Sequence, residues 1–165
     1  MFHTRPAAVA GAFYPDDRAT LLAEVEGWLH AADEPRDGER PPKAIIAPHA
    51  GYVYSGPVAA TAYARVAALR GRVSRVVLAG PAHRAWVRGA AVPRADRFAT
   101  PLGDVKLDAE AIARLRLLPF VETSDEAHAH EHSLEVQLPF LLATLGEFTL
   151  VPVVVGGATP AEVAR

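Results

Sequence analysis

The sequence predicts an α/β fold built on a mainly parallel sheet with helices on both faces. Three short apolar runs, at residues 43–48, 74–79 and 148–155, are typical of strands that are buried on both faces. Helix-prone stretches, at residues 58–69 and 132–145, separate them along the chain. Strands that alternate with helices indicate right-handed crossovers, and such crossovers produce parallel strand pairs.

The first predicted element is an amphipathic helix over residues 16–32. Asp16 or Asp17 supplies a suitable N-cap, because a short acidic side chain accepts a hydrogen bond from the first free backbone N–H groups. Apolar residues recur in this stretch at helical spacing. Residues 33–42 combine proline, glycine and charge, which predicts an exposed loop that leads to the first strand.

After the first strand, Ser55 is a plausible N-cap and Pro57 suits the first turn of the helix at 58–69. Residues 92–107 are typical of short irregular strands joined by turns. Asp108 then caps a further helix that extends to residue 117 or 118.

The last residues contain a helix signal of their own. The segment Thr159-Pro-Ala-Glu162 is a capping box with proline at the first helical position, yet the sequence ends at Arg165. We therefore expect residues 1–165 to be a single α/β domain that is truncated at its C-terminus. The length fits one domain, since domains usually have about 100–200 residues.

Composition excludes several classes of function. Formal net charge is −2 and the basic residues are scattered, so the sequence has no electrostatic signature of a nucleic-acid partner. Cysteine is absent, which excludes disulfides, thiolate zinc sites and cysteine nucleophiles within these residues. No apolar stretch approaches the roughly 18 residues of a membrane span, and no targeting signal is evident at the N-terminus. We expect a cytoplasmic protein with no membrane partner.

Two histidines follow predicted strands. His49 comes directly after the strand at 43–48, and His83 follows the strand at 74–79 after a Gly-Pro-Ala turn. Because ligands bind beyond the carboxyl ends of parallel strands, both imidazoles can converge in one crevice. Each histidine alone also fits a satisfied polar side chain at a turn. The pair favours a metal site, since neutral imidazole is the commonest side-chain metal ligand.

A second candidate pair lies in the polar segment before the predicted helix at 132–145. His132 and Glu135 are three positions apart and share one face of that helix, where they could serve as ligand, as base or as partners that orient a ligand. The alternative is a solvated helix start. His128 and His130 carry no comparable signal, and His3 and His30 are expected at the surface.

Five motifs span nearly the whole chain. They are Arg5-Pro-Ala-Ala-Val-Ala-Gly-Ala-Phe-Tyr-Pro15, Ala44-Ile-Ile-Ala-Pro-His-Ala-Gly-Tyr-Val-Tyr-Ser-Gly56, Leu78-Ala-Gly-Pro-Ala-His83, Thr100-Pro-Leu-Gly103 and Glu131-His-Ser-Leu-Glu-Val-Gln-Leu-Pro-Phe140. Together and in this order they resemble the Memo family, whose prokaryotic members are usually named AmmeMemoRadiSam system protein B. The resemblance implies a fold shared with the catalytic subunit of class III extradiol dioxygenases.

The resemblance also implies roles for particular residues. His49 and His83 match the family's two metal-site histidines, which take the places of the dioxygenase iron ligands. A third ligand, a cysteine, and a further active-site histidine belong to the family's C-terminal portion, beyond Arg165. Iron or copper is the metal implied, and a radical SAM protein of the same system is an implied partner.

We therefore predict a metal-binding protein that resembles non-haem iron extradiol dioxygenases, with His49 and His83 as metal ligands and with His132 and Glu135 as catalytic residues. A bound metal could activate dioxygen or a phenolic substrate, or lower the pKa of a water to about 7. The alternative is a non-enzymatic module that binds a peptide or protein through a vestigial active-site crevice. The ligand is in either case an unidentified small molecule or peptide.

Overall fold

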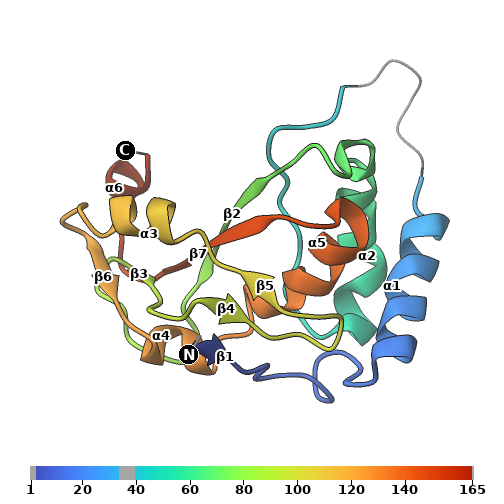
Figure 1. The fold of residues 1–165 in the computed structure, drawn as a ribbon, viewed down its shortest axis with the longest axis horizontal. Coiled ribbons are helices and arrows are strands. Elements are labelled where there is room, and N and C mark those ends of the chain that lie inside the picture. Colours follow the sequence, from blue (N-terminus) through green and yellow to red (C-terminus); the bar gives the residue numbers. More distant parts are fainter. Residues whose placement is uncertain (1–2, 34–39, 165) are drawn as a thin grey trace.

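The computed structural model describes residues 3–33 and 40–164 (Figure 1). None of the helices in these ranges is long and apolar enough to cross a membrane. In chain order the elements are β1 (Thr4–Arg5), α1 (Arg18–Ala31), α2 (Tyr52–Ala64), a 3-10 turn (Ala67–Leu69), β2 (Arg75–Pro81), β3 (Ala90–Val92), β4 (Arg97–Phe98), β5 (Val105–Lys106), α3 (Ala109–Leu115), β6 (Val121–Thr123), α4 (Glu126–Ala129), a second 3-10 turn (Glu135–Gln137), α5 (Leu138–Leu145), β7 (Thr149–Val155) and α6 (Pro160–Val163).

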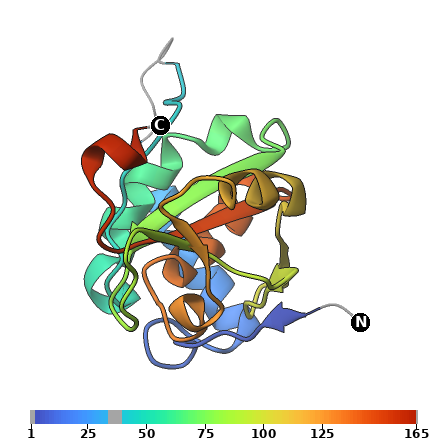
Figure 2. The same ribbon diagram turned by 90° about the vertical axis from the view of Figure 1, so that its left-hand side faces the viewer.

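The larger sheet has the strand order β2-β7-β3-β6. Strands β2 and β7 are parallel along their whole length, from the pair Arg75 and Thr149 to the pair Pro81 and Val155. Strand β3 is parallel to β6 but antiparallel to β7. Figure 2 shows β2 and β7 side by side across the molecule, with β2 at the edge of the sheet.

A smaller sheet joins the N-terminus to the middle of the chain. Strand β1 lies parallel to β4, and β4 pairs with β5 in the antiparallel direction. Arg5 is thereby placed opposite Phe98, and its guanidinium carbon lies 4.9 Å from the centre of the Phe98 ring. This pairing holds the N-terminal segment against the body of the protein.

The main core lies between the larger sheet and the three helices α1, α2 and α5, which pack together in Figure 1. Leu21 of α1, Ala60 of α2 and Leu138 of α5 are fully buried there. A smaller cluster that includes Val87, Leu134 and Val154 occupies another side of β7. Both groups bury apolar surface, which supplies about 25 cal/mol of stabilisation per Å².

Several predicted elements are confirmed. Helix α1 is capped by Asp17, whose carboxylate accepts from the Thr20 N–H at 2.8 Å. Asp108 caps α3, and Thr159 begins α6 with its capping box. Strands β2 and β7 form at the second and third apolar runs. The predicted loop at 33–42 falls mostly on residues 34–39, which are outside the described residues.

Two helix starts differ from the prediction. Helix α2 begins at Tyr52, so Pro57 lies inside it and Ser55 is not its N-cap. The reason is the burial of Tyr52, whose hydroxyl donates to the Val136 carbonyl at 2.7 Å. The helix predicted at 132–145 instead begins with a 3-10 turn and becomes α-helical only at Leu138.

The fold is α/β, as predicted, but the larger sheet is mixed, and β2 and β6 are its edge strands among the described residues. Residues 43–48 do not form the predicted strand, because no described segment pairs with them. Strand β2 was expected to be buried on both faces, yet the Val77 side chain is 68% exposed. An apolar run predicts an extended conformation and burial, but pairing also needs a neighbour in register.

Candidate metal centre

His49 lies in the loop between residues 43–48 and helix α2. Hydrogen bonds fix the backbone on both sides of it. Gln137 Nε2 donates to the Pro48 carbonyl at 3.0 Å, and Ser55 Oγ donates to the Ala50 carbonyl at 2.8 Å. The His49 backbone is therefore held against α2 and the 3-10 turn before α5, both of which belong to the core.

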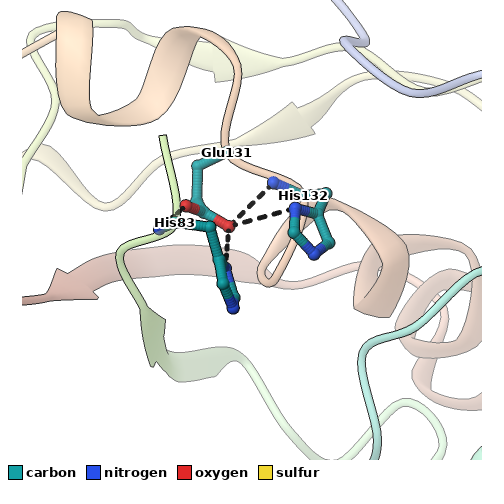
Figure 3. A group of neighbouring side chains, drawn as sticks. All are labelled: His83, Glu131 and His132. Atoms are coloured by element: carbon teal, nitrogen blue, oxygen red, sulfur yellow. Dashed lines mark hydrogen bonds and ion pairs between the residues drawn. The ribbon is translucent and has the colours of Figure 1, made fainter. Parts of the chain in front are cut away.

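His83 follows the end of β2, and Glu131 determines how it is oriented. The His83 backbone N–H donates to Glu131 Oε2 at 2.6 Å, and its Nδ1 lies 2.9 Å from Glu131 Oε1. A side chain on Gly80 would overlap Ser133, so glycine here lets β2 approach the loop that carries Glu131. The opposite ring nitrogen of His83 faces away from Glu131 (Figure 3).

A third histidine joins the first two. The ring centres of His49 and His83 are 5.2 Å apart, those of His83 and His132 are 4.6 Å apart, and those of His49 and His132 are 6.0 Å apart. The structure thus brings together three of the four residues that the sequence singled out. The His83 side chain is 36% exposed and that of His132 is 13% exposed, so the cluster is reachable from solvent.

Glu131 lies beneath the cluster as a buried carboxylate. Its Oε1 also accepts from the backbone N–H groups of His132 and Ser133, each at 2.9 Å. Burial alone would raise the pKa of this carboxyl, but the hydrogen bonds from Ser133 and His83 outweigh it and lower the pKa to about 2. Glu131 is therefore ionised at neutral pH, and its negative charge lies next to His83.

The cluster has the composition of a metal site. Ring nitrogens of His83 and His132 and a carboxylate oxygen of Glu131 lie within 4.8 Å of one another, so this group could hold a metal ion. His132 Nδ1 is buried and has no hydrogen-bond partner among the described residues, since Glu131 Oε1 is 3.5 Å from it. A buried polar atom without a partner costs about 1–3 kcal/mol, which a bound ion can offset.

The protonation states suit metal binding. Burial lowers the pKa of His49, and the neighbouring His83 lowers it further. Burial also lowers the pKa of His132, although the Glu131 charge opposes this effect. Both imidazoles are therefore neutral at pH 7 and keep a lone pair, which is the form that coordinates metals.

Glu135 does not share the crevice with His132, contrary to the sequence prediction. It is fully buried, and its carboxylate accepts from Arg5 Nη1 at 2.6 Å and from the Tyr14 hydroxyl at 2.6 Å. The backbone N–H groups of Ala8 and Val9 also donate to it. Helical spacing predicted a common face with His132, but His132 precedes the 3-10 turn (Glu135–Gln137) and is not helical, so the two side chains do not share a helix face.

Sequence reasoning missed the role of Glu131. The residue lies inside the motif around His132, but no periodicity separates it from the acidic residues nearby. Only the approach of β2 to this loop brings His83 into hydrogen-bond range of Glu131.

His128, for which the sequence shows no functional signal, is buried, and its Nε2 lies 3.1 Å from the Ala91 carbonyl. Its burial and its contacts with the Ala91 carbonyl, the Phe98 ring and Arg5 are consistent with a structural residue.

The chain is similar to known proteins of one family. A family model described as Memo-like protein matches residues 5–165. A MEMO1 family protein of Ignicoccus hospitalis is 44% identical over 98% of this chain and 59% of its own length. One from Aquifex aeolicus is 40% identical over 92% of this chain and 54% of its own length. The Protein memo-1 homolog of Caenorhabditis elegans is 38% identical over 93% of this chain and 43% of its own length.

The chain therefore spans between about two-fifths and three-fifths of the length of these relatives. The family match extends over residues 5–165, a range that includes His49, His83, Glu131 and His132. The chain belongs to the Memo-like family.

Proposed function

We propose that this chain carries the histidine part of a metal centre for iron or copper in a dioxygenase-like protein. The observation that supports it is the convergence of His49, His83 and His132, with ring centres 4.6–6.0 Å apart. A set of imidazoles that leaves positions open for water or substrate is typical of non-haem iron and copper sites.

Within this proposal, Glu131 orients a ligand rather than binding the metal. Its two oxygens already accept from His83, His132 and Ser133, so little acceptor capacity remains. A carboxylate that accepts from one ring nitrogen of a histidine fixes the tautomer and directs the other nitrogen to the ion. Figure 3 supports this assignment, because the free ring nitrogens of His83 and His132 both point away from Glu131.

A bound iron or copper ion would supply activation of dioxygen or of a phenolic oxygen, or acidification of a bound water. The chain's own contribution is to hold neutral imidazoles in place. His132 also packs against the Phe13 ring, with ring centres 4.8 Å apart, which limits its rotation. The substrate class remains that of the sequence prediction, an unidentified small molecule or peptide.

The proposal is tested by metal binding. Full-length protein purified without chelator is assayed for bound metal and then titrated calorimetrically with ferrous ion under anaerobic conditions and with cupric ion. We expect binding of at least one ion, and we expect His49→Ala to lose at least about 10–100-fold in affinity, as even partners of metal ligands do. The variant should stay folded, because His49 is a half-buried loop residue, and a change at such a position costs about 0.5 kcal/mol or less.

His30→Ala is the matched control, since His30 is exposed in α1, outside the cluster. It should bind as the unaltered protein does. If the unaltered protein binds neither ion, or if His49→Ala binds as well as His30→Ala, the metal centre is refuted. The histidine cluster would then be better explained as part of a crevice that binds a peptide or protein.

A further inference from the structure

A groove runs between strand β2 and the extended residues before His49. Residues 42–47 form one wall, residues 75–81 of β2 form the other, and apolar side chains from α2 and α5, such as Tyr63 and Leu141, lie between them. The cavity has a volume of about 680 Å³. Both walls are consecutive stretches of chain, and the wall at residues 75–81 is a β-strand.

Both walls have backbone groups that no described residue uses. Strand β2 is at the edge of its sheet and pairs with β7 on one side only. Residues 43–47 form no backbone hydrogen bond with any part of the chain that the structure describes. Unpaired N–H and C=O groups along an extended edge are a template for another strand, and this groove presents such an edge on each side.

The side chains on the two walls alternate in the same way. Ile45 and Ala47 on one wall pack against the main core, as Val76 and Leu78 do on the other. The residues between them point outward, and Ile46 is 98% exposed while Val77 is 68% exposed. Alternation with a period of two is the pattern of a strand. The two walls therefore resemble two strands of one sheet whose intervening strand is supplied from elsewhere.

We propose that this groove is filled by an additional β-strand, which pairs with β2 on one side and with residues 43–47 on the other. The occupant is a segment from the part of the family's length that this chain does not span. That part is roughly two-fifths of the Ignicoccus hospitalis relative, which leaves ample sequence for one strand. The apolar floor requires apolar side chains at alternate positions of the inserted strand.

The location of the groove links this strand to the histidine cluster. His49, Gly80, Pro81 and Ser133 line it, so one end of the inserted strand comes to the loops that carry the imidazoles. The strand would thus complete the sheet at the place where the site is built. Its insertion can be tested through the backbone alone and requires no metal, so failure of the metal proposal would leave this inference standing.

The test compares this chain alone with a fusion in which the remaining sequence of the Ignicoccus hospitalis relative follows it. Hydrogen–deuterium exchange is measured on the backbone amides of residues 43–47 and 75–81. Amides that enter a ladder exchange more slowly, and we expect slowing of at least about tenfold in both stretches. Unchanged exchange in either stretch would overturn the proposal.

The same exchange measurement on the intact relative, compared with a version cut to the span of this chain, gives the answer if the fusion does not fold. The amides at the matching positions should be protected only in the intact protein. Equal exchange in the two versions of the relative would also refute strand insertion.

Paired substitutions then locate the contact. Ile46→Asp with Val77→Asp places charge on both walls at side chains that are exposed in this chain, so the chain alone should remain folded. In the fusion, this double variant should lose most of the added amide protection. Val53→Asp with Val58→Asp is the control, because these α2 valines are 83% and 59% exposed and do not line the groove. Equal protection in the two double variants would place the strand elsewhere.

Discussion

Arg5 and Glu135 form a buried ion pair across 130 positions of sequence, with Arg5 Nη1 2.6 Å from Glu135 Oε2. The same guanidinium donates to the carbonyls of His128 and Glu131, at 2.6 Å and 2.8 Å. Arg5 therefore connects strand β1 to both ends of the segment at residues 128–131, which positions Glu131. The conformation of this segment, and with it the position of the histidine cluster, depends on the Arg5–Glu135 ion pair, which lies outside the cluster.

We predict that Glu135→Gln lowers the free energy of unfolding by about 3–5 kcal/mol, because it leaves the buried Arg5 charge without its counter-ion. Urea denaturation followed by circular dichroism measures the change. Glu110→Gln is the control, since Glu110 pairs with Arg114 at the surface of α3 and such pairs contribute about 0.3–0.5 kcal/mol. Similar losses in the two variants would show that the Arg5 pair is not a main source of stability.

A second prediction concerns Glu131→Gln. The variant retains the size of the side chain but loses the charge that accepts from His83 Nδ1. If Glu131 orients a metal ligand, affinity for ferrous or cupric ion should fall by about 10–100-fold, as measured by calorimetry. Glu122→Gln on β6 changes an exposed carboxylate and should have no effect. Metal affinity that is the same in both variants would count against an orienting role.

A third prediction is a pH dependence of stability from His128. Burial lowers the pKa of His128 in the folded protein from the ordinary value of 6.5 to about 4. The unfolded chain therefore binds this proton more readily, and stability falls as the pH decreases from 6.5 toward 4. With 1.36 kcal/mol per pKa unit, the loss from this group is about 3 kcal/mol at pH 4.

The variant His128→Gln removes this titration while keeping a side-chain donor for the Ala91 carbonyl. Its free energy of unfolding should change less than that of the unaltered protein between pH 6.5 and pH 4. His30→Gln, at an exposed position, should keep the full dependence. The two curves would coincide if His128 were protonated in the folded state.

A fourth prediction compares two glycines in neighbouring helices. A methyl group at Gly56 of α2 would overlap the Trp28 ring, which is itself packed between Tyr52 and Phe140. Gly56→Ala should therefore destabilise the protein by about 1–3 kcal/mol. Nothing lies within 4 Å of a methyl group at Gly27 in α1, so Gly27→Ala should stabilise it by up to about 1 kcal/mol. Thermal unfolding of both variants tests the sign of each effect.

Local signals in the sequence predicted the elements whose causes are local. Asp17, Asp108 and Thr159 each cap a helix with their own side chains, and the contacts span only three residues. The apolar run at 148–155 contains β7. Leu150, Val151, Pro152 and Val154 of this strand are buried, so both of its faces are covered. The sequence also predicted that His49 and His83 lie close together, because each follows a segment of chain that leads toward the same crevice. Their ring centres are 5.2 Å apart.

Tertiary structure decided the features that depend on residues far apart. Glu131 is within hydrogen-bond distance of His83 only because β2 packs against a loop that follows 48 positions later in the chain. Glu135 does not lie beside His132, because its carboxylate binds Arg5 and Tyr14 instead. Residues 43–48 show why such features cannot be predicted from local sequence alone. Their composition determines that they are extended and apolar, whereas a strand also requires a partner, which no local pattern can supply. The sequence by itself therefore determined which residues cap the helices, which runs are apolar, and that His49 and His83 lie close together. The packing of distant segments decided that Glu131 binds His83 and that Glu135 binds Arg5 and Tyr14.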